Sequence, residues 1–252
     1  MIAVIDTHCH ISIDDYDNID ELICKIKDAG ITKVIVNGCD LRSNIEVLSL
    51  VKKYDIVYGA LGLHPTELSD DNDKCIEFIM SHCNDKKIVA IGEIGLDYHY
   101  DNYDKSLQII YFKKQLDIAK KFKLPVIVHT RDAIQDCYDI LSLYNLRGSI
   151  HCFSGSLEMA KRFVSLGYKL GIGGVVTYGN AKNIKEVVGE LSLSNLLLET
   201  DSPYLTPDPY RNLKNDSSYI PLIAEKISLI KGVPVSSVAE ITTKNANDIF
   251  EF

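Results

Sequence analysis

The sequence lacks the features that mark a membrane-spanning, secreted or disordered protein. No run of residues approaches the roughly 18 consecutive apolar positions that a membrane-spanning helix needs. The first residues carry no basic segment of the kind that opens a secretory signal, and no linker or low-complexity segment interrupts the chain. With 46% hydrophobic and 25% charged residues over 252 positions, the composition is that of a globular protein with a large core. We therefore expect no membrane association, and nothing in the sequence implies an obligate protein partner.

Positive charge and paired cysteines are also scarce. The formal net charge is -8, from 27 Lys and Arg against 35 Asp and Glu, so the chain as a whole cannot present the broad positive surface of most duplex-binding proteins. Any nucleic acid must therefore be held locally. The 7 cysteines are odd in number and show no CxxC spacing, which argues against a disulfide framework or a zinc ribbon. These features predict a cytoplasmic enzyme or binding protein with reduced thiols.

Short apolar, β-branched runs recur along the chain, each followed by a turn and then by a longer segment with helical spacing. Their starts are 20 to 38 residues apart, about the size of one βα unit. Eight such units predict an α/β fold, a (β/α)8 TIM barrel in one domain over residues 1–252, because a doubly wound sheet more often has about five or six strands. The predicted strands are residues 2–5, 33–37, 57–61, 88–91, 126–128, 149–150, 169–172 and 196–198. A helix is predicted over 104–122, and two closing helices over 217–231 and 236–249.

Histidine and carboxylate side chains follow the predicted strands. In a barrel the loops after the strands converge on one rim, which is where function is expected. Because side chains alternate along a strand, His8 and His10 point the same way, and Asp6 lies one layer beneath them, placed to accept a ring N–H. Imidazole with carboxylate, without thiolate, suits Zn, Mn, Fe or Mg at a hydrolytic centre. The residues expected at this rim are His8, His10, His64, Glu93, His129, His151 and Asp201.

Seven short segments, in order along the chain, carry a resemblance to a known family. They are residues 5–10, 62–65, 92–98, 128–133, 151–156, 199–205 and 245–250. Together they resemble the TatD family of metal-dependent deoxyribonucleases, within the amidohydrolase-type barrels. One segment departs from the family pattern: Lys214-Asn215-Asp216-Ser217 stands where the family usually has Arg-Asn-Glu-Pro. That change concerns the loop after the eighth strand, and hence substrate preference more than metal binding.

The resemblance implies two divalent metal ions, with Mg, Mn and Zn as candidates. It places His8, His10 and Asp201 on one ion, His129 and His151 on the other, and Glu93 between them. Because this position on strand four is Glu93 and not the carboxylated lysine of dihydroorotase-like relatives, hydrolysis of amide rings is disfavoured.

Two catalytic carboxylates are expected, Asp201 and Glu93. Two cations would lower the pKa of a held water toward about 7, and Asp201 is the expected general base for that water. His64 and Arg131 are candidates to clamp a phosphate, although Arg131 could instead pair with Asp132 or Asp97.

Other rim residues are candidates for holding the substrate. Tyr98, Phe153 and Tyr204 could stack on a base or could anchor loops. Ser154, after the sixth strand, is a further candidate substrate contact. Glu199 is expected one layer below Asp201, as a structural acid.

These residues predict a metal-dependent hydrolase of DNA phosphodiester bonds. We expect single strands or strand ends as substrate, in the manner of an exonuclease, because a barrel mouth without a basic groove can hold little duplex. The alternative is a carboxylic ester or amide hydrolase on the same binuclear centre, such as an aminoacyl-tRNA deacylase. A non-catalytic metal-binding barrel is disfavoured, because all the expected ligand positions carry competent side chains.

Overall fold

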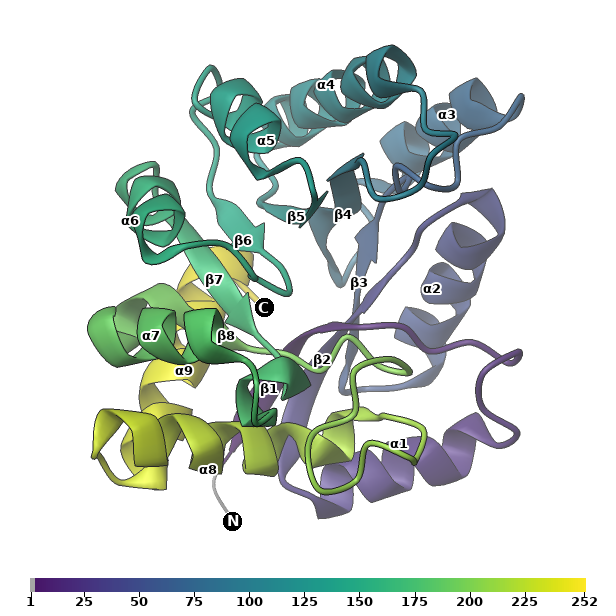
Figure 1. The fold of residues 1–252 in the computed structure, drawn as a ribbon. Coiled ribbons are helices and arrows are strands. Elements are labelled where there is room, and N and C mark those ends of the chain that lie inside the picture. Colours follow the sequence, from purple (N-terminus) through teal and green to yellow (C-terminus); the bar gives the residue numbers. More distant parts are fainter. Residues whose placement is uncertain (1–2) are drawn as a thin grey trace.

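Eight parallel strands follow one another in chain order around a barrel in the computed structural model, which describes residues 3–252 (Figure 1). The seam between β8 and β1 is bridged at Cys9 and Ser202, and the Thr7 hydroxyl donates to the Leu198 carbonyl at 3.0 Å. The (β/α)8 TIM barrel predicted from the sequence is confirmed. The strands are β1 Val4–Cys9, β2 Ile31–Asn37, β3 Val57–Leu61, β4 Ile88–Asp97, β5 Val126–Arg131, β6 Gly148–Ile150, β7 Tyr168–Ile172 and β8 Leu196–Leu198.

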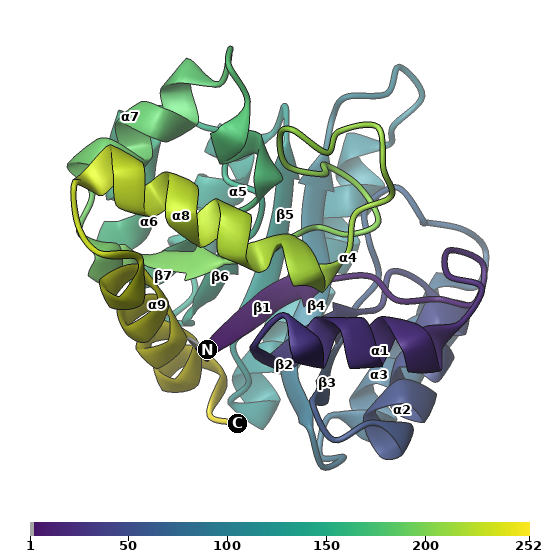
Figure 2. The same cartoon turned by 90° about the horizontal axis from the view of Figure 1, so that it is seen from below.

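The helices surround the strands on the outside (Figures 1 and 2). The helix predicted over 104–122 is α4, which begins after Asp104, and the Asp104 side chain caps it by accepting the Leu107 N–H at 2.9 Å. The first closing segment is a short 3-10 turn, η3 Ser217–Tyr219, followed by α8, which has a proline in its first turn. The helices are α1 Ile19–Asp28, α2 Leu41–Lys53, α3 Asn72–His82, α4 Lys105–Phe122, α5 Ile134–Leu141, α6 Leu157–Ser165, α7 Lys182–Glu190, α8 Ile220–Lys231 and α9 Val235–Phe250, with further 3-10 turns η1 Gly174–Thr177 and η2 Leu193–Asn195.

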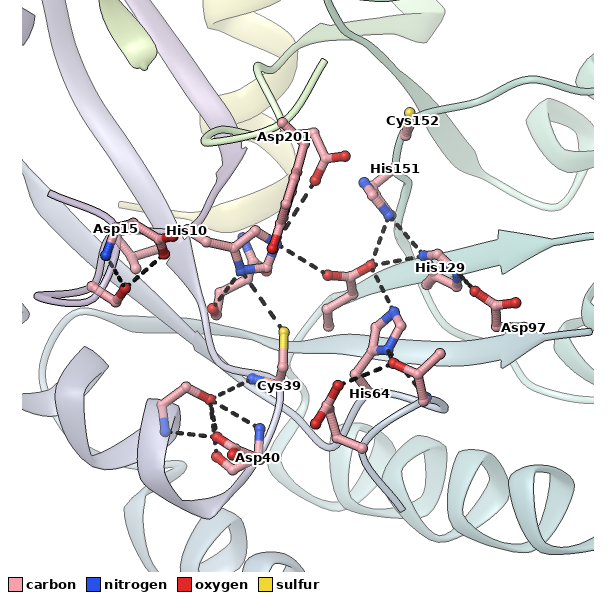
Figure 3. Close-up of a pocket in the computed structure, with 18 of the residues that line it drawn as sticks. His10, Asp15, Cys39, Asp40, His64, Asp97, His129, His151, Cys152 and Asp201 are labelled. Carbon is pink, nitrogen blue, oxygen red and sulfur yellow. Dashed lines mark hydrogen bonds and ion pairs between the residues drawn. The ribbon is translucent and has the colours of Figure 1, made fainter. Parts of the chain in front are cut away.

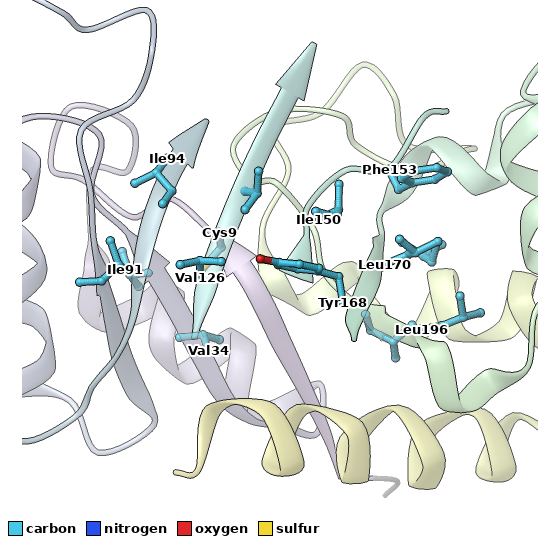
Figure 4. Close-up of a cluster of buried hydrophobic side chains, with 14 of the residues drawn as sticks. Cys9, Val34, Ile91, Ile94, Val126, Ile150, Phe153, Tyr168, Leu170 and Leu196 are labelled. Atoms are coloured by element: carbon cyan, nitrogen blue, oxygen red, sulfur yellow. The ribbon is translucent and has the colours of Figure 1, made fainter. Parts of the chain in front are cut away.

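Strand residues alternate between two apolar clusters. On β5, Val126 and Val128 belong to the large cluster between the barrel and its helices, part of which is drawn in Figure 4, whereas Ile127 between them belongs to a second, smaller cluster. The smaller cluster fills the barrel interior and includes Phe250 of α9. Apolar packing thus occupies one part of the interior and leaves the other end to polar groups.

Several strands extend further than the sequence pattern predicted. The predicted strand 88–91 continues to Asp97, because Gly95 and Leu96 pair with His129 and Thr130 of β5. Glu93 is therefore inside a strand and not in the loop after it. The first predicted strand began at Ile2, which lies outside the described residues, and β1 runs on to Cys9. The cause is the same in both strands: polar side chains that face the barrel interior do not end the backbone ladder.

Buried side-chain amides from the helices hold the segments that carry the rim residues. Asn44 of α2 donates to the Gly62 carbonyl at 2.7 Å and accepts its N–H at 3.0 Å. Gln115 of α4 makes the same paired contact with Leu63, at 3.1 and 2.7 Å. Gln108 of α4 does so with Asp97, at 2.8 and 2.9 Å. Each amide satisfies backbone groups that have no strand partner and so fixes the rim in place.

No helix within residues 3–252 is long and apolar enough to cross a membrane.

We expect Gln115→Leu to lower the free energy of unfolding by about 1 to 3 kcal/mol, because it leaves both backbone groups of Leu63 buried without partners. The midpoint of urea unfolding at constant slope measures this change. Gln135→Leu, at an exposed position on α5, is the matched control and should stay within about 0.5 kcal/mol of wild type. Equal unfolding midpoints for the two variants would contradict the role given to Gln115.

Candidate metal centre

Glu93 of β4 lies among imidazole rings, and its two carboxylate oxygens face different rings. Figure 3 shows the rings of His10, His64, His129 and His151 that gather at this site. Oε1 is 2.8 Å from His151 Nε2 and 2.9 Å from His129 Nδ1. Oε2 is 3.3 Å from His8 Nε2 and 3.4 Å from His10 Nε2. One carboxylate therefore joins two separate pairs of histidines.

Asp201, directly after β8, stands beside the first pair. Its Oδ1 lies 3.5 Å from His8 Nε2 and 3.7 Å from His10 Nε2. Its backbone N–H donates to the His8 carbonyl at 3.0 Å, and the His10 N–H donates to the Ser202 carbonyl at 2.7 Å. The same contacts that close the barrel at β1 and β8 thus place this carboxylate.

Close backbone approach positions Glu93. A methyl group at Gly62, just after β3, would lie 2.5 Å from the Gly92 carbonyl carbon and 2.6 Å from the Glu93 nitrogen. Only glycine allows the chain to pass this close. The Glu93 N–H also donates to the Gly38 carbonyl at 3.1 Å. The loops after β2 and β3 therefore both contact the β4 backbone at Glu93.

The outer nitrogens of several rings are held by other groups. His10 Nδ1 is 3.1 Å from the Asn37 carbonyl, and His129 Nε2 is 3.0 Å from Asp97 Oδ2. Such contacts fix a ring's orientation and leave its other nitrogen for the centre of the site. Asp97 is itself held by the Gln108 amide, so the buried amides of α4 also support the His129 ring.

The donor set fits divalent cations. His8 Nε2 and His10 Nε2 are 3.2 Å apart, as are His129 Nδ1 and His151 Nε2, and each pair faces one oxygen of Glu93. Several ring nitrogens thus converge beside carboxylate oxygens in a buried site, an arrangement of the ligand types that Zn, Mn and Fe accept. Groups with ligand atoms within 4.8 Å of one another include His8, His10 and Asp201, and also His64, Glu93 and His129.

Opposing effects set the proton affinities of this cluster. Burial raises the pKa of Glu93, but the charges of His151, His64 and His8 outweigh it and hold that pKa well below its usual value. Burial lowers the pKa of His8, yet attraction to Glu93 and hydrogen bonds to Asp201 and Glu93 raise it to about 9. The pKa of His129 is likewise raised to about 9, because hydrogen bonds to Asp97 and Glu93 outweigh burial. Burial and the charge of His8 lower the pKa of His151 to about 4.

The structure corrects the expectation for Asp6 and adds a second set of contacts for His64. Asp6 does not accept a ring N–H: it accepts the backbone N–H groups of His8 and Thr200 at 3.1 Å and the Thr200 hydroxyl at 2.6 Å, so it holds β1 to the end of β8. His64, a candidate to clamp a phosphate, lines the pocket and also lies beside the cluster, with Nε2 3.4 Å from Glu93 Oε1.

The other expected substrate contacts divide between the pocket and its surroundings. Arg131 and Ser154 line the pocket of about 850 Å³ that opens over the histidines, and so does Tyr204. In residues 3–252 Arg131 makes no ion pair with Asp132 or Asp97, and its guanidinium lies over the Tyr100 ring at 5.6 Å. Tyr98 is not in the lining: its hydroxyl donates to Asp136 at 2.9 Å and its ring stacks on Tyr103.

Sequence reasoning missed one residue of the mouth, Cys39, and left two roles open for Phe153. Cys39, after β2, lies with Sγ 3.8 Å from His10 Nδ1, so a thiol does stand at the edge of the cluster, although burial raises its pKa and keeps it protonated. Its place directly after a predicted strand was the signal that could have found it. Phe153 packs in the core against Phe163 and does not reach the pocket.

The buried acid Glu199 and the unusual loop after β8 both have structural partners. Glu199 accepts the Cys152 N–H and lies 3.8 Å from His151 Nδ1, and burial raises its pKa to about 8.

In the loop after β8, Asp216 caps η3 by accepting the Ser218 N–H at 2.8 Å, and it pairs with Lys25 at 2.6 Å. Asp216 therefore shapes this turn despite the departure from the family pattern.

Comparison with known proteins gives one consistent result. Residues 5–251 match the family described as TatD related DNase. The chain is 38% identical to the uncharacterized metal-dependent hydrolase YabD of Bacillus subtilis, over 97% of this chain and 98% of that protein. The crystal structure of YjjV, a TatD homolog from Escherichia coli K12, superposes with a TM-score of 0.92 at 32% identity, over 99% of this chain and 98% of the other. A TatD family hydrolase from Entamoeba histolytica has the same fold, with a TM-score of 0.84 at 21% identity over 98% and 97% of the two chains.

We expect Mn²⁺ binding to the metal-stripped protein to strengthen as the pH rises from 7 to 9. Below pH 9 the His8 and His129 rings hold protons that a metal must displace, so protons are released on binding and compete with it. Calorimetry in buffers of different ionisation enthalpy measures both the affinity and the proton release. His82→Gln, on α3 away from the site, should follow the wild-type curve. An affinity that already levels off near pH 6.5 would show that the rings titrate at their ordinary pKa.

Proposed function

The chain belongs to the TatD-related DNase family of metal-dependent hydrolases, and from that premise we propose that it hydrolyses phosphodiester bonds of DNA, in single strands or at strand ends. The observation that carries the proposal is the Glu93 carboxylate, whose two oxygens face two different pairs of imidazoles. Such a carboxylate is suited to bridge two cations, and paired divalent cations are a recurrent device of nucleases and phosphatases.

We assign the ligands by position around Glu93. His8, His10 and Asp201 would hold one ion, and His129 and His151 the other, with Glu93 shared. When bound, divalent cations at this donor set polarise phosphoryl oxygens and lower the pKa of water toward about 7. Since these six ligands include two carboxylates, two divalent ions leave the site near a formal +2. An acidic chain with a net charge of -8 can thus attract one phosphate at a single point.

Asp201 is placed to take a proton from the attacking water. It lines the pocket, so its carboxylate reaches the space in which a substrate would lie. Burial raises its pKa, but hydrogen bonding to His8 and the charges of His151, His8 and His10 lower it overall, so the carboxylate is ionised at neutral pH and can accept a proton. These properties fit a general base.

The size and lining of the pocket favour a single strand or a strand end. A volume of about 850 Å³ admits a nucleotide with its neighbours but no duplex. Arg131 is the cation in the lining that has no carboxylate partner in the part of the chain described, and it is placed to contact a phosphate beside the cluster. Ser154 offers a hydroxyl on the same side.

EDTA treatment should abolish cleavage of labelled single-stranded DNA, and added Mg²⁺, Mn²⁺ or Zn²⁺ should restore part of it. A parallel panel of duplex DNA, RNA and aminoacyl-tRNA, tested with the metal-loaded protein, identifies the bond that is cut. Release of an amino acid from charged tRNA without release of nucleotides from DNA would replace the nuclease by an ester hydrolase. Cleavage of DNA that survives metal removal would reject the proposed chemistry.

Asp201→Asn should reduce kcat for single-stranded DNA by about 10² or more while leaving the protein folded, because it removes the proposed proton acceptor and one metal ligand. Asp208→Asn, an exposed acid in the same loop after β8, is the matched control and should retain wild-type kcat. Circular dichroism checks the fold of both variants. A wild-type rate for Asp201→Asn would show that Asp201 is not the general base.

A further inference from the structure

The pocket over the metal centre has two chemically different sides. The side formed by the loops after β1, β2 and β3 and by the first turns of α2 carries five carboxylates: Asp14, Asp15, Asp40, Glu46 and Glu67. We call this side the acidic arc. Its one basic residue, Arg42, is paired with Asp14 at 2.6 Å and Glu46 at 3.3 Å, so its charge is already balanced.

The opposite side is formed by the end of β5 and by the segments after β4 and β6. Outside the metal centre and the Asp97 that holds His129, its lining contains no carboxylate, and its charged residue is Arg131. The Arg131 guanidinium lies over the ring of Tyr100, which is 53% exposed and also faces the pocket. We call Tyr100, Arg131 and Ser154 the open arc. In Figure 3, Asp15 and Asp40 of the acidic arc lie to one side of the histidines, and Asp97 and Cys152 lie to the other.

These two sides cannot bind a polyanion equally. A strand that crossed the whole pocket would place its phosphates against the acidic arc, and like charges closer together than a Debye length of about 8 Å repel each other with little screening. A strand that stops at the metal centre avoids this repulsion and keeps the favourable contacts of the open arc: a phosphate at Arg131 and a base on Tyr100. The unequal charge of the two arcs therefore determines which bonds of a strand can reach the metal centre.

We propose that the open arc binds the polynucleotide and that the acidic arc excludes any phosphate beyond the cleaved bond, so that cleavage is confined to a strand end. The acidic arc is a barrier in this arrangement and holds no ligand. Only the terminal residue, which has no further phosphate, lies on its side of the metal centre. Tyr204, 63% exposed in the lining near Asp201, offers a ring for that residue's base. This inference rests on the proposed nuclease function.

A comparison of a linear single-stranded oligonucleotide with the same oligonucleotide ligated into a circle tests the barrier. Wild type should cut the linear form and leave the circle nearly intact. The variant Asp14→Asn/Glu46→Gln/Glu67→Gln should raise the ratio of circular to linear cleavage about tenfold or more. Its control, Glu186→Gln/Glu190→Gln/Glu225→Gln, changes the net charge equally on the exposed faces of α7 and α8 and should leave the ratio unchanged.

The open arc is tested by binding. Arg131→Ala should weaken binding of a phosphorothioate oligonucleotide and make its logarithmic salt dependence shallower by about 0.7, the effect of one lost phosphate contact on a single strand. Arg162→Ala removes a similar arginine, stacked on Tyr138 away from the pocket, and should change neither quantity. Fluorescence anisotropy at several salt concentrations measures both.

The outcomes separate this inference from the function on which it rests. If wild type cuts no linear nucleic acid, the proposed function fails. If it cuts linear DNA but cuts circles equally fast, or if the acidic-arc variant leaves the ratio unchanged, the nuclease stands and the barrier is wrong. If the Arg131→Ala variant binds with wild-type affinity and salt dependence, the open arc does not bind the polynucleotide.

Discussion

The buried carboxylate of Glu93 is the constraint on which this end of the barrel depends. An ionised carboxylate taken out of water is strongly destabilising unless opposite charge or hydrogen bonds surround it. Here the surrounding groups are the rings of His8, His10, His64, His129 and His151, which come from segments far apart in the chain. The free energy that favours an ionised Glu93 therefore also favours the convergence of those rings. The contacts that bring the proposed metal ligands together are therefore also contacts that hold the barrel rim in its folded form.

The rim is held rigid by side chains that do not line the pocket. Asp6 ties β1 to the end of β8, and the amides of Asn44, Gln108 and Gln115 hold the loops after β3 and the end of β4. These groups satisfy backbone atoms that the strand ladder leaves unpaired. Because the Asp97 backbone is held by Gln108 and the Asp97 side chain contacts His129, one chain of contacts runs from a surrounding helix to a ring of the candidate metal centre. Metal-site geometry of this kind depends on the supporting contacts as much as on the ligands.

The net negative charge of the chain is compatible with the proposed phosphodiester chemistry because of where the charges lie, not because of how many there are. Total charge predicts how a protein interacts at long range, whereas a pocket responds to the few groups within about a Debye length. Five carboxylates on one side of the mouth and one unpaired guanidinium on the other make the local field uneven. Arg42 and Arg131 illustrate the point: both line the pocket, but only Arg42 is balanced by carboxylates.

Local sequence determined the order of strands and helices and the identity of the polar residues at the rim, because periodicity and strand-end chemistry are local properties. It predicted the barrel, and it singled out His8, Glu93 and Asp201 by type and position. Strand lengths were misjudged where interior-facing polar residues continue a ladder, as in β4, since pairing with β5 is a long-range contact. The partner of Asp6, the place of Cys39 beside His10, the turn of Tyr98 away from the pocket and the unequal sides of the mouth were decided only by tertiary structure. Each depends on the direction in which a side chain points after segments tens to hundreds of residues apart have packed, and no local pattern records that direction.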